Sequence, residues 1–121
     1  MNHASFDVPA GAVAHAVLPR VVGALGAQAD LPLDRIHDCV LTVDAMLACV
    51  DGDRVIAHAG VATDGIEILI GPLSSAHADG AVSPMALGAP GAVVVALSDR
   101  AWIDHRGASP AVGTFLSARR R

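Results

Sequence analysis

Residues that could hold a metal are spread along the whole chain. Six histidines are present: His3, His15, His37, His58, His77 and His105. A zinc site needs ligands at defined spacings, such as two histidines one helical turn apart or a Cys-x-x-Cys pair. Neither pattern occurs, and the consecutive His37, Asp38 and Cys39 would splay around a helix axis. We therefore expect exposed or half-buried imidazoles and no metal site.

The residues that could act as nucleophiles or bind phosphate do not form a known catalytic or phosphate-binding motif either. Ser74 and Ser75 lie near His77, but the strained G-x-S-x-G turn of a hydrolase is absent. No P-loop or G-x-G-x-x-G occurs, and in the glycine-rich Gly88–Gly91 segment Pro90 removes a backbone donor that a phosphate would use. The residues alone predict no catalytic group, which favours a non-catalytic binding domain.

Composition predicts one domain, spanning 1–121. Hydrophobic residues make up 53% of the 121 residues and charged residues 17%, which is typical of a folded chain with one core. The net charge is -4, all eight basic residues are arginine, and the only basic cluster is the terminal Arg119–Arg121. Direct nucleic-acid binding would require a broader basic face. We expect no such binding.

A cytoplasmic location follows from three observations. The start of the chain lacks a basic segment followed by an apolar one, as in a secretory signal. The longest uncharged run, 80–98, is interrupted by prolines and glycines, so we do not expect a membrane span. Cys39 and Cys49 fall in one predicted helix, about 15 Å apart, which is beyond the reach of a disulfide, roughly 7 Å. We expect both thiols to be free.

Hydrophobic spacing predicts two helices after a short strand at Phe6–Val8. The first spans Ala10–Ala27, is kinked or divided by Pro19 and ends at Gly26. The second carries an apolar stripe with steps of three and four residues, which we expect to pack on a sheet. The stripe consists of Leu33, Ile36, Val40, Val43, Leu47 and Val50.

Asp51-Gly52 ends the second predicted helix, and the remaining predicted elements follow it. Alternating residues predict strands at Arg54–Val61 and Ile66–Ile70, joined by a turn at Thr63–Gly65. After a loop at Gly71–Gly91 come a helix at about 92–98 and a hairpin formed by 101–106 and 112–117. The order β-α-α-β-β-α-β-β predicts a two-layer α/β sandwich, with helices on one face of a mostly antiparallel sheet.

Several segments together resemble anti-sigma factors of the serine-protein kinase type, which have the histidine-kinase-like ATPase fold. Leu31–Ile36 followed by Leu41–Asp44 resembles the stretch before the family's N-box. Ala96–Asp99 resembles the end of its third helix, Gly113–Arg119 its last strand, and Ile66–Leu73 a strand and its exit. The resemblance covers nearly the whole chain in matching order. It implies that fold for residues 1–121.

The resemblance also assigns nucleotide-pocket positions, and most of their chemistry is missing. The positions are Asp38, Thr42, Ala45, Cys49, Gly71, Gly88 and Gly91. Ala45 stands where the family has its catalytic Glu, Cys49 where it has the Mg²⁺-binding Asn, and Gly71 near its adenine-reading Asp. Asp44 is one residue from the Glu position, and we expect it to point about 100° away. No Lys or Arg occurs from Gly71 to Gly91 to hold phosphates.

The expected function is therefore regulation without catalysis, with no catalytic residue, metal, ATP or other cofactor. By resemblance, the partners would be a sigma factor or an anti-anti-sigma protein, and the chain would form a homodimer through the first helix, Val13–Leu25. One alternative is a weak ATP-binding serine-protein kinase with non-standard residues. Another is a dimeric interaction domain unrelated to sigma factors.

Overall fold

The strands and helices follow one another in the order that the sequence predicts. The computed structural model describes residues 3–74, 84–105 and 107–118. Their elements are β1 (His3–Pro9), α1 (Ala12–Gln28), α2 (Leu33–Leu47), β2 (Arg54–Ala62), β3 (Gly65–Gly71), the short 3-10 helix η2 (Pro84–Leu87), α3 (Ala89–Leu97), β4 (Arg100–Asp104) and β5 (Ala111–Ser117).

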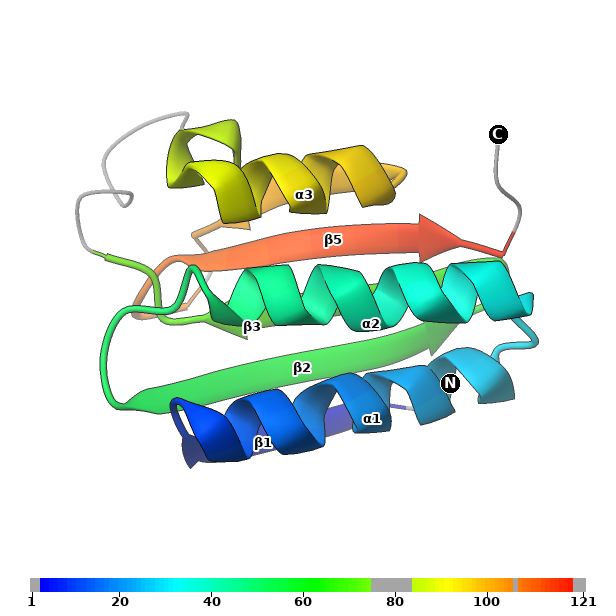
Figure 1. The fold of residues 1–121 in the computed structure, drawn as a ribbon, viewed down its shortest axis with the longest axis horizontal. Coiled ribbons are helices and arrows are strands. Elements are labelled where there is room, and N and C mark those ends of the chain that lie inside the picture. The colour runs from blue at the N-terminus through cyan, green and yellow to red at the C-terminus, as the bar shows by residue number, and fades with distance from the viewer. Residues whose placement is uncertain (1–2, 75–83, 106, 119–121) are drawn as a thin grey trace.

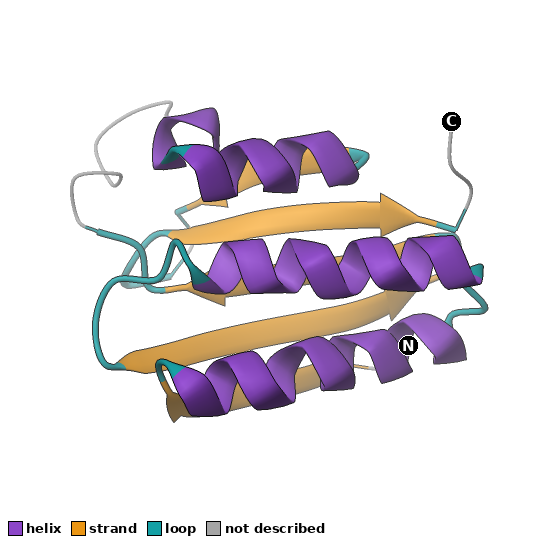
Figure 2. Ribbon diagram, viewed as in Figure 1, coloured by secondary structure: helices purple, strands orange, loops and turns teal. Residues whose placement is uncertain are grey.

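One sheet of five strands forms the base of the molecule. Its order is β1-β2-β3-β5-β4, and every neighbouring pair is antiparallel. The three α-helices lie side by side on one face (Figures 1 and 2). The predicted layering, an α/β sandwich with helices on one face of an antiparallel sheet, is confirmed. No described helix covers the opposite face, which we call the open face.

Alternation along the central strands builds the core. Ile66, Ile68 and Ile70 of β3 point to the helices and are fully buried. Val55, Ala57 and Ala59 of β2 are buried on the same side of the sheet, so the predicted hairpin is confirmed. Side chains in a strand alternate between faces, so the intervening residues point to the open face. The described chain thus has a single core, between the sheet and the helices.

Helix α1 differs from the prediction at two positions. Of the two outcomes predicted at Pro19, a kink or a division, the division does not occur: α1 is one helix through Pro19, which is buried beside Leu18, and burial of this apolar face outweighs the single lost hydrogen bond. It also continues past Gly26 to Gln28, and Asp30 provides the left-handed residue (φ 57°) that reverses the chain. Leu31 N–H donates to the Gly26 carbonyl at 3.0 Å, which closes the helix end.

The apolar stripe of α2 is rotated away from its predicted orientation. Of its six residues only Val43 and Leu47 are buried, and Leu33 is 68% exposed. Ile36 and Val40 are half-buried and face α1 at Gly23, while Val50 lies beyond the end of the helix. The buried face of α2 consists of Arg35, Asp38, Cys39, Thr42, Val43, Met46 and Leu47. The prediction that all six stripe residues pack on the sheet is therefore wrong.

Other boundaries shift by a few residues. The helix predicted at 92–98 begins at Ala89, and η2 lies inside the predicted loop. Strand β4 ends at Asp104 rather than Arg106. Cys49 lies beyond α2, so the two cysteines do not share a helix, although both are free as predicted. Ser75 and His77 lie outside the described residues.

A buried arginine explains the rotation of α2. The Arg35 guanidinium donates to Asp38 Oδ2 at 2.8 Å and to Asp99 Oδ2 at 2.6 Å, and its Nε donates to the Ser117 carbonyl at 3.0 Å. Asp99 Oδ2 also accepts from the backbone N–H of Ser117 at 2.7 Å. Only 3% of the Arg35 side chain is exposed. A buried charge must be paired, so Arg35 faces inward where its partners lie.

We expect Arg35→Met to lower the free energy of unfolding by about 3–5 kcal/mol, because it leaves two carboxylates without their cation. The matched control is Arg54→Met, which breaks the exposed pair with Asp7 (2.9 Å) and should cost about 0–1 kcal/mol. Urea unfolding followed by circular dichroism measures both. Equal midpoints for the two variants would contradict the role given to Arg35.

Candidate functional site

The family resemblance directs attention to a groove in the helical layer. It lies between α2 and α3, has a volume of about 400 Å³, and is bordered by His15 of α1. Its other lining residues are Leu41, Asp44 and Ala45 from α2, Ala48 just after α2, and Ala89, Pro90, Val93 and Leu97 from α3. His15 and Asp44 are the only polar side chains among them. The groove is therefore an apolar surface with one polar pair at its rim.

Ala45 is the only one of the seven assigned positions that lines this groove. Its methyl group can neither accept a proton nor orient a water molecule. Cys49 follows the end of α2, and its thiol donates to the Ala45 carbonyl at 3.4 Å, so it stays beside Ala45. A protonated thiol is a poor ligand for Mg²⁺, which prefers oxygen atoms.

Asp44 lines the groove, one residue before Ala45. No contact among the described residues tests the expectation that its side chain points away from the catalytic position. Its Oδ1 lies 2.8 Å from His15 Nδ1, and the side chain is 61% exposed. The contact with α1 turns the carboxylate toward the neighbouring helix. This pair links α1 to α2 at the surface.

Asp38 and Thr42 belong to the core rather than to the groove. Asp38 pairs with Arg35, which commits its carboxylate to holding the fold. Thr42 is fully buried, and its hydroxyl is the one buried side-chain oxygen or nitrogen in the described ranges that has no hydrogen-bond partner. An unsatisfied buried hydroxyl costs about 1–3 kcal/mol. Neither residue lines the groove.

Gly88 and Gly91 shape the start of α3. Gly88 is the residue before the helix and takes φ 80°, a conformation that favours glycine. Gly91 is buried directly against η2, where an added Cβ would collide with the carbonyl oxygen of Pro84. Both glycines are thus required by the backbone path. They position Ala89 and Pro90, which line the groove.

Gly71 lies apart from the other assigned positions. It pairs with Ile56 in the β2–β3 ladder, and a Cβ added there would lie 3.0 Å from the Cβ of Ala111, on the open face. A side chain at this position would therefore point away from the groove. The structure thus separates the seven positions into the core, the groove with its borders, and the opposite side of the sheet.

Sequence reasoning missed the contacts that cross between elements. Arg35 and Asp38 are three residues apart on a helix, a spacing that does signal an ion pair. Asp99 is 64 residues from Arg35, and His15 is 29 residues from Asp44, so no local pattern could reveal either contact. Only the tertiary structure reveals these two pairs.

Comparison with known protein families finds no match for this chain, and comparison with curated proteins finds no significant match. The described residues form a small α/β protein with three α-helices and an open, five-stranded antiparallel sheet. Across the described ranges, no group of three or more His, Cys, Asp or Glu residues could hold a metal. None of the helices in these ranges is long and apolar enough to cross a membrane.

Both thiols are held in their protonated form. Burial raises the pKa of Cys39 to about 11, from an ordinary value of 9.0, although the nearby Arg35 guanidinium lowers it. Burial also raises the pKa of Cys49. The thiolate is the reactive form of cysteine, so both side chains are poor nucleophiles near neutral pH.

We expect the free energy of unfolding to fall between pH 9 and 11. The unfolded chain loses its thiol protons near pH 9 and folded Cys39 only near pH 11, so rising pH favours the unfolded state in that window. The difference amounts to about 2–3 kcal/mol for Cys39. The chain has no lysine or tyrosine, whose side chains normally titrate in this range.

Urea unfolding at several pH values measures this loss. A Cys39→Ala, Cys49→Ala variant should be less stable below pH 9 but nearly independent of pH from 9 to 11. The same slope in the variant and the parent protein would show that another group is responsible.

Proposed function

We propose that this chain is an anti-sigma-type regulatory domain with the histidine-kinase-like ATPase fold, acting in the cytoplasm without catalysis. The observation that carries the proposal is the order β-α-α-β-β-α-β-β over an antiparallel sheet with all three α-helices on one face. The segments that resemble the family occur in that same order along the chain. A sigma factor or an anti-anti-sigma protein would be the partner.

Loss of catalysis is supported by the groove between α2 and α3. The position of the family's general base holds Ala45, and the position of its metal ligand holds Cys49. Asp44, the acid among the groove's lining residues, is hydrogen-bonded to His15. Removing one general base typically costs about 10²–10⁴ in rate, and absence of a metal clamp adds to that loss. Binding a protein partner requires none of these groups.

We expect no micromolar binding of Mg-ATP, no ATP hydrolysis, and no phosphate transfer to a candidate antagonist. Calorimetric titration of the purified protein, together with a radiolabelled transfer assay, measures all three. Ala45→Trp, which fills the groove, is the control. Micromolar binding or transfer that this variant abolishes would reveal a divergent kinase site in place of an inactive one.

We expect the purified protein to form a stoichiometric complex with a sigma factor or an anti-anti-sigma protein on a gel-filtration column. Candidates are those encoded beside its gene. Failure to bind any of them, together with a stable homodimer, would favour the interaction domain unrelated to sigma factors.

A homodimer through α1 is part of the proposal. Val13 and Val17 on α1 are 51% and 40% exposed, so this helix has an apolar outer surface that a second copy could cover. We expect Val17→Glu to shift sedimentation to the monomer. The matched control, Val95→Glu, alters an equally exposed valine on α3 and should leave the dimer intact. A parent protein that is monomeric at high concentration would remove this part of the proposal.

A further inference from the structure

Helix α3 carries no polar or charged side chain, yet most of it lies at the surface. Of its nine residues, Ala89–Leu97, only Gly91 and Val94 are buried. Val93 and Val95 are 41% and 39% exposed. A helix that is apolar on all sides is normally covered by other parts of a protein. The exposure of α3 therefore indicates a surface that a partner covers.

The groove between α2 and α3 joins this surface to a second apolar stripe. Leu41 and Ala45 line the groove from α2, and Ala48 lines it just after the end of that helix. Leu41 is 55% exposed. Because Ala45, Ala48 and Ala89 are small, the groove has room for larger side chains of a partner, which would contact Leu41 and Val93.

The shape of the groove favours a helical partner. Both walls are α-helices, whose backbone groups are bonded within the helix, so an extended segment could not add to them as a strand. A segment that lies on apolar side chains must satisfy its own backbone groups, as a helix does. With nine residues, α3 is about 14 Å long. A partner helix of about ten residues, with apolar side chains three and four apart, would cover it.

The charge around the groove favours a basic partner. Asp44 is the only Asp, Glu, Lys or Arg among the described lining residues, and its side chain is 61% exposed. Elsewhere on α2, Asp34 is exposed and the single arginine, Arg35, is buried. A carboxylate has about four acceptor sites, so Asp44 can bind a cation while it keeps its contact with His15.

We propose that the groove between α2 and α3 binds a basic amphipathic helix of a partner protein. The apolar side chains of that helix would lie against Leu41 and Val93, and a Lys or Arg side chain would pair with Asp44. The inference rests on the proposed function, because it takes the groove to hold no nucleotide, and it names the structural element by which a regulatory partner would bind.

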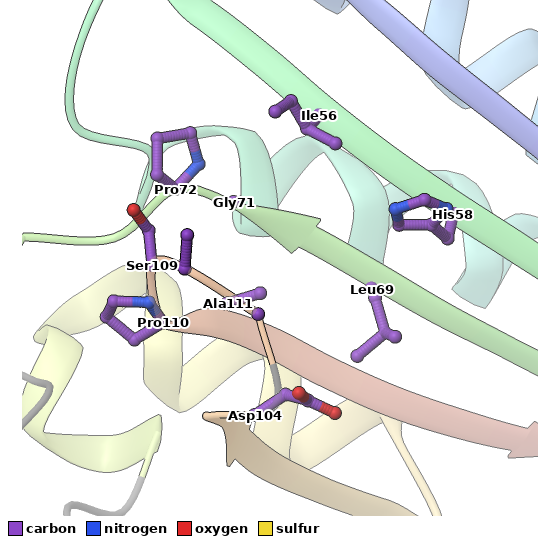
Figure 3. A pocket seen from close by; sticks show the side chains of 11 residues that line it. Ile56, His58, Leu69, Gly71, Pro72, Asp104, Ser109, Pro110 and Ala111 are labelled. Atoms are coloured by element: carbon purple, nitrogen blue, oxygen red, sulfur yellow. The ribbon is translucent and has the colours of Figure 1, made fainter.

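The open face of the sheet provides an internal comparison. It carries a hollow of about 450 Å³, which we call the open-face cavity. Strands β2, β3 and β5 form its floor, and the loop 107–110 forms one wall beside Pro72 (Figure 3). Ile56 lines this cavity and is 46% exposed. The cavity is about as large as the groove but is not bordered by two helices, so a helix that recognises the groove should not bind there.

A labelled helical peptide tests the groove without any natural partner. The probe has about 15 residues, with leucines three and four residues apart and lysines beside them. Fluorescence anisotropy should show saturable binding, about tenfold or more tighter than that of the same peptide with glutamate in place of lysine. Asp44→Asn should weaken binding about two- to fivefold. Asp34→Asn removes the same charge outside the groove and should bind like the parent protein.

Val93→Gln replaces an apolar contact in the groove by a neutral polar side chain and should weaken binding by about tenfold. The matched control is Val95→Gln, which changes an equally exposed valine of the same helix outside the groove. A second control is Ile56→Gln in the open-face cavity. Both controls should bind like the parent protein.

Absence of binding by the lysine peptide, equal binding of the glutamate peptide, or equal affinities of Val93→Gln and Val95→Gln would overturn the inference. A dimer that Val93→Gln converts to monomers would also overturn it, because a second copy would then occupy the groove. A protein that binds the peptide but neither a sigma factor nor an anti-anti-sigma protein loses the proposed function and keeps the inference. A protein that forms such a complex but does not bind the peptide keeps the function and loses the inference.

Discussion

The guanidinium of Arg35 joins three parts of the chain that are far apart in sequence. It extends from α2 to Asp99, the residue before β4, and to the Ser117 carbonyl at the end of β5, and it pairs with Asp38 on its own helix. Its Nη1 also lies 3.3 Å from the carbonyl of Leu97, the last residue of α3. The helix layer is therefore tied to the sheet at this point by directed, charged contacts.

This cluster constrains how α2 can lie. A helix with 3.6 residues per turn has several faces that could be buried, and its apolar stripe alone would turn Leu33 inward. Burying Arg35 turns Leu33 outward and moves Ile36 and Val40 to the seam with α1. Leaving a guanidinium unpaired in the core would cost more than exposing one leucine, so the charged cluster decides the rotation.

The two faces of the sheet differ in chemistry. The helix-covered face holds the core and, above it, an apolar groove whose only polar pair is His15 with Asp44. The open face carries a cavity with a buried carboxylate, Asp104. Shape and chemistry are carried by different residues, and a fold can keep its form when the residues of a site change. Gly91 illustrates this separation. A side chain at this position would collide with Pro84, so the fold requires glycine there regardless of what the groove binds.

The sequence by itself determined the order of elements and the hairpin of two alternating strands. Period-two alternation from Val55 to Ile70 and the Asp64-Gly65 turn are local signals, and local signals survive in a single sequence. The assignment of Ala45 and Cys49 to a nucleotide pocket came only from the family resemblance. Tertiary structure alone decided the rotation of α2, the separation of Gly71 from the groove, and the formation of the open-face cavity. Each depends on partners far along the chain, such as Asp99 for Arg35 or Ala111 for Gly71, and the spacing of residues holds no information about those contacts.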